Sequence, residues 1–301
     1  MELWIPITIA AAFLQNLRSA LQKHLKGRLS TAGAAYARFV YAWPLALVYV
    51  WGLHEIGGLA WPRPNGLFLL YTVLGGLTQI LFTVLLLWMF SFRSFAVGTT
   101  FSKLEVVMVA GLGAVILGDG LGPAAIVAVL VSAAGVVCLS LDRTRLGPGA
   151  LLSGLAEKPT LIGFACAACL GASVVFFRGG ALALGHDNVA MAAGYTFAIA
   201  VVLQTLMMGA WIRWREPGEF TRIFRHWRWA APVGVAGALG SIGWFTAFTM
   251  QNAAYVRALG QIELVFTFVV ALTVFRERVS RMEIAGILLV VGAILLLLLA
   301  G

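Results

Sequence analysis

Charged residues are scarce in this chain, and the residue types that build catalytic and metal sites are scarcer still. Asp, Glu, Lys and Arg together make up 11% of the 301 residues, against about 25% in a typical soluble domain. There are only 4 histidines, and no H-E-x-x-H, G-x-S-x-G or ATP-binding P-loop motif occurs. We therefore expect neither an enzyme nor an ATP-driven pump, and no metal or other cofactor.

Cysteine is also rare, and its positions argue against redox chemistry. The 3 cysteines are Cys138, Cys166 and Cys169, and each falls inside an apolar run. Cys166 and Cys169 have C-x-x-C spacing, but no βαβ pattern surrounds them. We interpret all three as buried thiols that serve packing.

Apolar residues are what the chain has in excess. Hydrophobic residues make up 61% of it and the mean hydropathy is +0.95, which excludes an ordinary soluble domain. A run of about 18 or more apolar residues is long enough to cross a bilayer as a helix. We predict an all-α, polytopic membrane protein whose ten transmembrane helices leave no room for a soluble catalytic domain. The predicted helices span roughly residues 3–22, 32–53, 67–91, 95–116, 123–141, 160–182, 188–212, 229–250, 254–275 and 284–300.

The net charge of +9 is distributed by connector, so it does not indicate a nucleic-acid partner. Of the 21 Lys and Arg residues, fifteen fall in the odd-numbered connectors, whereas the even-numbered connectors carry only Arg63 and Arg178. Such a bias marks the cytoplasmic connectors of a membrane protein. It predicts a multi-pass protein of the inner (plasma) membrane with both termini on the same, periplasmic, side.

One offset of 158 residues relates the two halves of the chain. It places Glu105 on Glu263 and Asp119 on Glu277, and residues 1–143 and 159–301 then align as two five-helix repeats joined by a linker over 144–158. Because each repeat has an odd number of helices, the second enters the membrane from the opposite side. Inverted repeats are typical of secondary transporters, whose binding sites lie near the bilayer midplane between the repeats. Other aligned pairs are Gly27 with Gly185, Phe39 with Phe197, Gly76 with Gly234, Phe90 with Phe248 and Ala96 with Ala254.

The pattern of acidic residues resembles the EamA-like ten-helix branch of the drug/metabolite transporter superfamily. In that family a mid-helix Glu is often followed 14 positions later by an acidic residue, as in Glu105…Asp119 and Glu263…Glu277. Gly286 and Gly292 in the last predicted helix also fit, whereas Val106 and Leu264 stand where relatives commonly have Pro. The resemblance implies secondary transport. It also implies cytoplasmic termini, the opposite of what the charge bias predicts.

Ionisable residues at membrane depth are costly and are functional candidates by default. We expect Glu105 and Glu263 to face a central cavity, where they would take up protons or bind a substrate cation. The alternative is a structural role as an ion pair or an interhelical hydrogen bond. Lys103, Arg257 and Gln261 are further candidates, because Thr99/Lys103 and their repeat mates Arg257/Gln261 share a helix face at i, i+4. Arg257 could instead extend its charge toward the membrane surface.

Other polar residues extend this candidate substrate site. In the first helix Gln15 and Arg18 belong to one polar face, although Arg18 and Arg38 both lie toward the first connector, where either could reach the interface. Gln79 in the third helix and Ser241 with Trp244 in the eighth complete the candidates, with aromatic packing as the alternative for Trp244. The fifth and tenth helices carry almost no such groups and should lie at the periphery.

These observations favour a secondary transporter that works by alternating access, with export as the expected direction. Its substrate would be a small polar or amphipathic metabolite such as an amino acid, and protons are the candidate coupling ion. The main alternative is efflux of lipophilic cations, bound by a carboxylate and aromatic walls. An intramembrane enzyme and a non-transporting scaffold are less favoured. Besides its substrate, the expected partners are the bilayer and protons, in a monomer or a homodimer.

Overall fold

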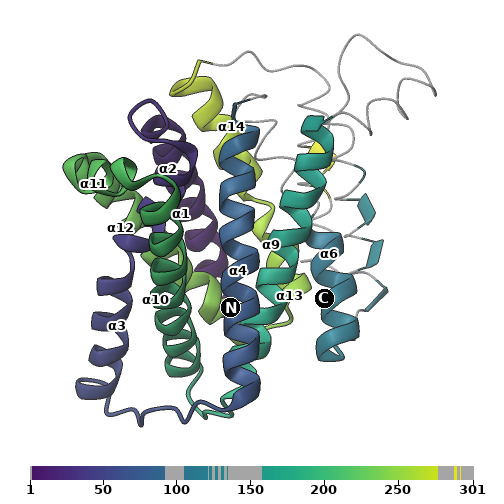
Figure 1. Cartoon of the computed structure of the whole chain (residues 1–301). Coiled ribbons are helices and arrows are strands. Elements are labelled where there is room, and N and C mark those ends of the chain that lie inside the picture. The colour runs from purple at the N-terminus through teal and green to yellow at the C-terminus, as the bar shows by residue number, and fades with distance from the viewer. Residues whose placement is uncertain are drawn as a thin grey trace.

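The computed structural model describes residues 2–91, 105–120 and 158–276, with a few isolated positions between 122 and 134 and between 288 and 292. All regular secondary structure in these residues is helical, as predicted (Figure 1). The described helices are α1 (Trp4–Leu25), α2 (Thr31–Val40), α3 (Trp43–Glu55), α4 (Gly66–Met89), α6 (Glu105–Leu112), the π-helical turn η2 (Gly113–Leu117), α9 (Lys158–Ala183), α10 (Val189–Arg215), α11 (Pro217–Arg225), α12 (Trp227–Met250), α13 (Ala253–Gly260) and α14 (Glu263–Thr273).

Several predicted helices correspond closely to observed ones. The predictions over 3–22, 67–91, 160–182, 188–212 and 229–250 match α1, α4, α9, α10 and α12 within a few residues. Among the described residues, five helical stretches are long and apolar enough to cross a membrane: 66–89, 161–183, 189–215, 227–250 and 253–273. The all-α, multi-pass membrane class is therefore confirmed. Most of the predicted fifth and tenth helices lies outside the described residues.

Two predicted helices are broken, contrary to the prediction. The predicted helix 32–53 consists of α2 and α3, separated at Tyr41 and Ala42. Pro44 has no N–H for the carbonyl of Val40, so the first helix ends and a second begins with proline in its first turn. The predicted helix 254–275 is likewise divided at 261–262, directly after Gly260, because glycine favours a helix end over a helix interior.

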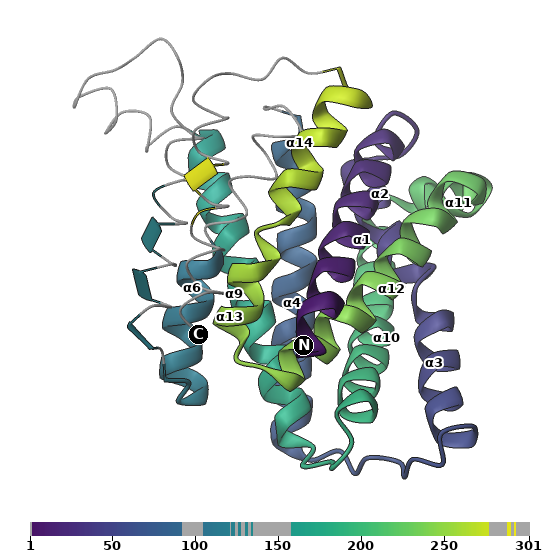
Figure 2. The same ribbon diagram turned by 180° about the vertical axis from the view of Figure 1, so that it is seen from behind.

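Glycines allow the helices to approach closely. The most extensive helix pairings in the described chain are those of α4 with α9 and of α1 with α12. In the first, a Cβ at Gly75 would lie 2.7 Å from the ring of Phe177; in the second, a Cβ at Gly243 would lie 2.9 Å from the Cβ of Ala11. Both views show these pairs side by side (Figures 1 and 2). Small residues are a common means of packing helices inside a bilayer.

Several helix pairings of one half recur in the other half of the chain. An offset of 158 residues carries α1 onto residues 162–183 of α9, and carries most of α4 onto α12, so the two most extensive pairings exchange places. Likewise, α6 packs on α9 as its mate α14 packs on α1, and α4 packs on α10 as α12 packs on α2. Two-fold related repeats would produce this pattern. The division into 1–143, 144–158 and 159–301 remains a prediction, because the linker lies outside the described residues.

A short amphipathic helix, α11, covers the start of α2. Glu219 of α11 is buried and accepts a hydrogen bond from the backbone N–H of Ser30 at 2.5 Å, and Glu216 accepts one from the hydroxyl of Ser30 at 2.6 Å. Carboxylates at a helix N-terminus stabilise it, because the unpaired N–H groups there carry partial positive charge. The connector after α1 and the connector before α12 therefore lie on one face of the molecule, which we call the α11 face.

Candidate functional site: a buried charged cluster between the two halves

Glu105 and Arg257 form a buried ion pair that joins the two halves of the chain. Glu105 is the first residue of α6 and Arg257 lies in α13; their side chains are 1% and 4% exposed, and Nη1 lies 3.3 Å from Oε1. The guanidinium also lies over two aromatic rings, 4.3 Å from the centroid of Trp244 and 5.1 Å from that of Phe248. One interpretation of the sequence had Arg257 extending to the membrane surface, and the structure shows that it does not.

Glu263 occupies the equivalent position in the second half but has different surroundings. It is the first residue of α14, directly after the break in the helix, and it is buried. Its Oε2 accepts a hydrogen bond from the amide of Gln15 in α1 at 2.6 Å, and one turn along, Asn16 donates to Thr267 at 2.5 Å. The partial positive charge of a helix N-terminus favours a carboxylate at this position.

Two further arginines lie close to these groups. Arg18 of α1 and Arg38 of α2 are 3% and 5% exposed, and their aliphatic chains pass on the same side of α12, beside Gly237. Arg18 is within electrostatic range of Glu263 and Arg257, and Arg38 within range of Arg18 and Arg257. The described part of the cluster therefore holds three guanidiniums and two carboxylates. Its formal balance is one positive charge.

A small enclosed cavity borders the cluster. Gln15, Arg38, Gln79, Ser241 and Arg257 provide its polar groups. It offers ≈ 20 Å³ to a group of the size of water, which is room for about one water molecule. The remainder of the wall is apolar and largely aromatic: Phe82, Leu170, Val174, Phe177, Trp244, Phe245 and Phe248. The walls come from α1, α2, α4, α9, α12 and α13, so both halves of the chain contribute.

Most of the predicted site residues are close together in the structure. Gln15, Gln79, Ser241, Trp244 and Arg257 line the cavity. The two carboxylates stand one layer behind it: Glu105 contacts Arg257, and Glu263 contacts Gln15. Arg18 belongs to the same cluster.

Two predicted residues are not cavity walls in the described structure. Gln261 is buried in the turn between α13 and α14, where its amide donates to the carbonyl of Arg257 at 3.5 Å. Lys103 lies outside the described residues. Among those that are described, no group of His, Cys, Asp and Glu is arranged to hold a metal ion.

Sequence reasoning missed Arg38 as a residue of the site. Its nearness to the first connector suggested a side chain that reaches the interface. In the structure α2 begins at Thr31, and Arg38 lies seven residues further, roughly 10 Å along the helix axis. A usable signal was present in the sequence, because Arg38 is the only charged residue among residues 32–40 and the helix therefore has no polar face. In the structure all of these residues are buried.

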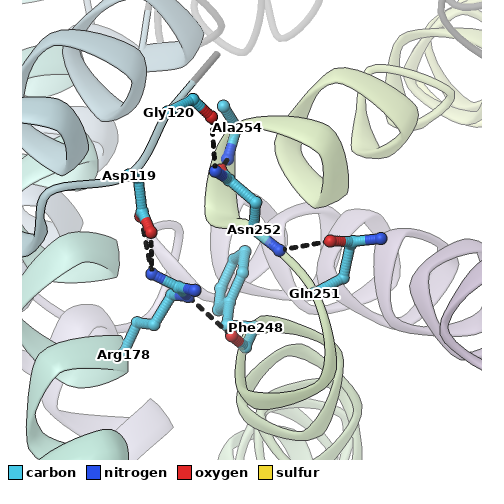
Figure 3. A network of polar contacts seen from close by, with 7 residues as sticks. All are labelled: Asp119, Gly120, Arg178, Phe248, Gln251, Asn252 and Ala254. Atoms are coloured by element: carbon cyan, nitrogen blue, oxygen red, sulfur yellow. Dashed lines mark hydrogen bonds and ion pairs between the residues drawn. The ribbon is translucent and has the colours of Figure 1, made fainter. Parts of the chain in front are cut away.

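A second polar network lies at the opposite end of α12 from the α11 face. Arg178, which the charge count assigned to a connector, lies inside α9. It donates to both carboxylate oxygens of Asp119 at 2.7 and 2.6 Å, and to the carbonyl of Phe248 at 3.0 Å. Asn252 donates to the carbonyl of Gly120 at 3.4 Å. Figure 3 shows these contacts joining the end of η2 to α9, α12 and α13. We call this network the Asp119 latch.

The fold and the buried charged cluster define an all-α, multi-pass membrane protein with a polar site enclosed among its helices. Comparison with known proteins identifies the family. The EamA-like transporter family matches residues 158–299, so the second half of the chain contains an EamA-like transporter domain, as the sequence predicted. This family consists generally of non-enzymatic transporters. No curated protein matches the chain.

A protein of known crystal structure shares the fold of the whole chain. The two superpose with a TM-score of 0.69 at 16% sequence identity, and the match covers 99% of this chain and 96% of the other. At this identity the likeness shows a common fold alone. It extends over the first half of the chain, which the family match does not reach.

Proposed function

We propose that this chain is a secondary transporter that moves a small polar or amphipathic metabolite by alternating access around the buried charged cluster. The observation that carries the proposal is the cluster itself: five charged side chains from both halves lie buried beside one cavity. Charged side chains inside a membrane are costly, and where they occur they commonly mark a substrate or ion pathway. A site between two similar halves can face each side of the membrane in turn.

The broken helix at residues 261–262 supports this function. In many transporters, helices are interrupted at the site, near the middle of the bilayer. Here the interruption is a tight turn, in which the N–H groups of Gln261 and Ile262 donate to the carbonyls three residues earlier. It lies directly before Glu263, and Gln261 within it is also buried. The exchange of helix pairings under the 158-residue offset supports the inverted repeat that this mechanism requires.

The structure corresponds to a closed arrangement. The cavity has room for about one water molecule, so a metabolite can enter only when helices separate. The Asp119 latch connects both halves at one end of the site. We propose that breaking this network opens that end, and that Glu105 or Glu263 carries the coupled proton.

Efflux of lipophilic cations has less support from the geometry. That function needs open aromatic faces or a carboxylate available to a cation. Here Arg257 covers the rings of Trp244 and Phe248 and also contacts Glu105. The positive balance of the described cluster would further repel a cation.

Transport in proteoliposomes tests the proposed function. The purified chain would be given a panel of radiolabelled amino acids and organic acids, with and without a pH gradient. We expect saturable uptake of at least one compound, which Arg257→Gln abolishes and Arg63→Gln leaves intact, because Arg63 is exposed in the connector before α4. Uptake no greater than in empty liposomes across the panel would contradict the proposal.

A further inference from the structure

Arg38 is a buried cation whose hydrogen-bonding capacity is largely unused. A guanidinium has five N–H donors. Within the described chain, the single hydrogen bond of this group runs from Nη1 to the hydroxyl of Thr83, at 3.0 Å. No carboxylate oxygen of the described residues lies within 4.0 Å of its nitrogens. A buried charge in this situation is unfavourable unless an anion or water completes its contacts.

The surroundings of Arg38 add positive charge. Arg257 is near enough to repel it, although that guanidinium is paired with Glu105. Arg18 also repels it and is itself partly balanced by Glu263. With three guanidiniums and two carboxylates in the described cluster, one bound monoanion would bring the formal charge to zero. Arg38 is the member to which no described carboxylate is assigned.

The position of Arg38 also suits a ligand. It lines the central cavity and a second, smaller one beside it, and Gln79 and Ser241 line both. These neutral groups can complete the hydrogen bonding of an anion. Trp244 also lines the central cavity, and its buried indole N–H has no hydrogen-bond partner in the described structure. The ring of Phe245 lines the same cavity. A cavity that combines hydrogen-bond donors with aromatic surface matches an amphipathic molecule.

We propose that Arg38 is the anion subsite of the transported substrate, and that this substrate carries a carboxylate on an apolar body. The inference rests on the proposed transport function and names its substrate class. The planar fork of a guanidinium fits a carboxylate through two parallel hydrogen bonds. A single excess positive charge favours a monoanion over a phosphate, which carries more charge. The apolar body lies against Phe177 and Phe245, whose rings contact each other at the cavity, after the helices separate enough to admit it.

Binding of matched small probes tests the subsite. Acetate and benzoate would be titrated into the full-length chain in detergent by calorimetry, against the neutral acetamide and benzamide and the cation benzylammonium. Wild type should prefer each carboxylate over its amide. Arg38→Gln should weaken benzoate binding by roughly tenfold or more and remove the preference, since charge-assisted hydrogen bonds are lost. Arg63→Gln removes a positive charge away from the site and should bind as wild type does.

A second variant keeps the test decisive if Arg38→Gln does not fold. Arg38→Lys retains the charge but not the fork, and should keep a preference for carboxylates at reduced affinity. Unchanged benzoate affinity in both variants, or stronger binding of benzylammonium than of benzoate, would overturn the subsite.

Transport separates this inference from the proposed function. Suppose that benzoate binds through Arg38, but that neither benzoate nor any other compound of the panel is carried into proteoliposomes. This result would support the subsite and overturn transport. Saturable uptake of benzylammonium that Arg38→Gln leaves unchanged would overturn the subsite while transport stands.

Discussion

Arg18 and Arg38 pass α12 at the same residue, Gly237. A Cβ at Gly237 would lie 3.4 Å from Cγ of Arg38 and 3.5 Å from Cδ of Arg18, which is ordinary van der Waals contact. The glycine therefore leaves both arginine chains room to bring their charges together beside the cavity. Gly234, one turn earlier, is more confined: a Cβ there would lie 2.7 Å from the carbonyl carbon of Tyr41.

This difference predicts opposite outcomes for two similar substitutions. Gly234→Ala forces α12 away from the backbone between α2 and α3, and overpacking of this kind costs about 1–3 kcal/mol. Gly237→Ala adds a methyl group at contact distance and should be close to neutral. Thermal unfolding in detergent checks this: the midpoint should fall clearly for Gly234→Ala and little for Gly237→Ala. Equal midpoints would mean that the close approach at Tyr41 is relieved at no cost.

The ion pair between Glu105 and Arg257 should show strong coupling in a double-mutant cycle. Removing one partner leaves the other charge buried, which costs about 3–5 kcal/mol. The double variant loses a certain amount of stability relative to wild type. We therefore expect Glu105→Gln and Arg257→Gln each to lose more than half of that amount. Unfolding midpoints of the four proteins measure the coupling.

A matched pair on the α11 face provides the control. Arg222 and Glu219 form an ion pair at 2.9 Å, but the arginine side chain is 50% exposed. Exposed pairs contribute little, so Glu219→Gln and Arg222→Gln should combine almost additively. If the coupling between Glu105 and Arg257 is as weak as that between Glu219 and Arg222, then water or another charge replaces either partner when it is removed.

Sequence reasoning was most successful where the pattern was long and apolar. Apolar runs of transmembrane length located α4, α9, α10 and α12, because a helix in a bilayer must satisfy all its backbone hydrogen bonds internally. The breaks at 41–42 and 261–262 were missed. Pro44 and Gly260 were visible signals, but hydropathy averaged over a window does not respond to a single interrupted hydrogen bond.

The sequence predicted which residues belong to the candidate site better than it predicted which of them contact each other. The 158-residue offset singled out Glu105 and Glu263, and both are buried near the cavity. Repeat symmetry could not show that one contacts a guanidinium and the other an amide, since Arg257 and Gln15 have Thr99 and Ser173 as their mates. Symmetry also gave no support to Arg38, which was assigned to the interface, because its mate is Thr196.

The Asp119 latch should control access to the cavity from its end of the molecule. Each charge-assisted hydrogen bond from Arg178 is worth about 1.5–3 kcal/mol, so Asp119→Asn, which removes the charge, should raise the open population roughly tenfold or more. The reporter is Ser241→Cys, at the cavity wall, in a chain whose native cysteines are replaced by alanine. Its reaction rate with a small impermeant thiol reagent should rise with Asp119→Asn.

Two controls distinguish opening from general loosening of the fold. Arg222→Gln breaks an ion pair on the α11 face and should leave the labelling rate of the Ser241→Cys reporter unchanged. The exchanged pair, Asp119→Arg with Arg178→Asp, should restore slow labelling in part, because the ion pair returns but the bond to Phe248 does not. A labelling rate that Asp119→Asn leaves unchanged would rule out a gating role for the latch.

The charge bias predicts that the α11 face is cytoplasmic and that both termini are periplasmic. The resemblance to the family instead implies cytoplasmic termini, and therefore a periplasmic α11 face. Arg225 in α11 and Arg63 in the connector before α4 are both exposed, and they lie in connectors predicted to face opposite sides. Single cysteines at these positions, in a cysteine-free chain, would be treated with an impermeant reagent in intact cells. We expect Arg63→Cys to react at once and Arg225→Cys only after lysis, because cationic connectors are retained in the cytoplasm. The opposite result would show that family topology outweighs the fifteen basic residues of the odd-numbered connectors, and the Asp119 latch would then close the cytoplasmic end of the pathway.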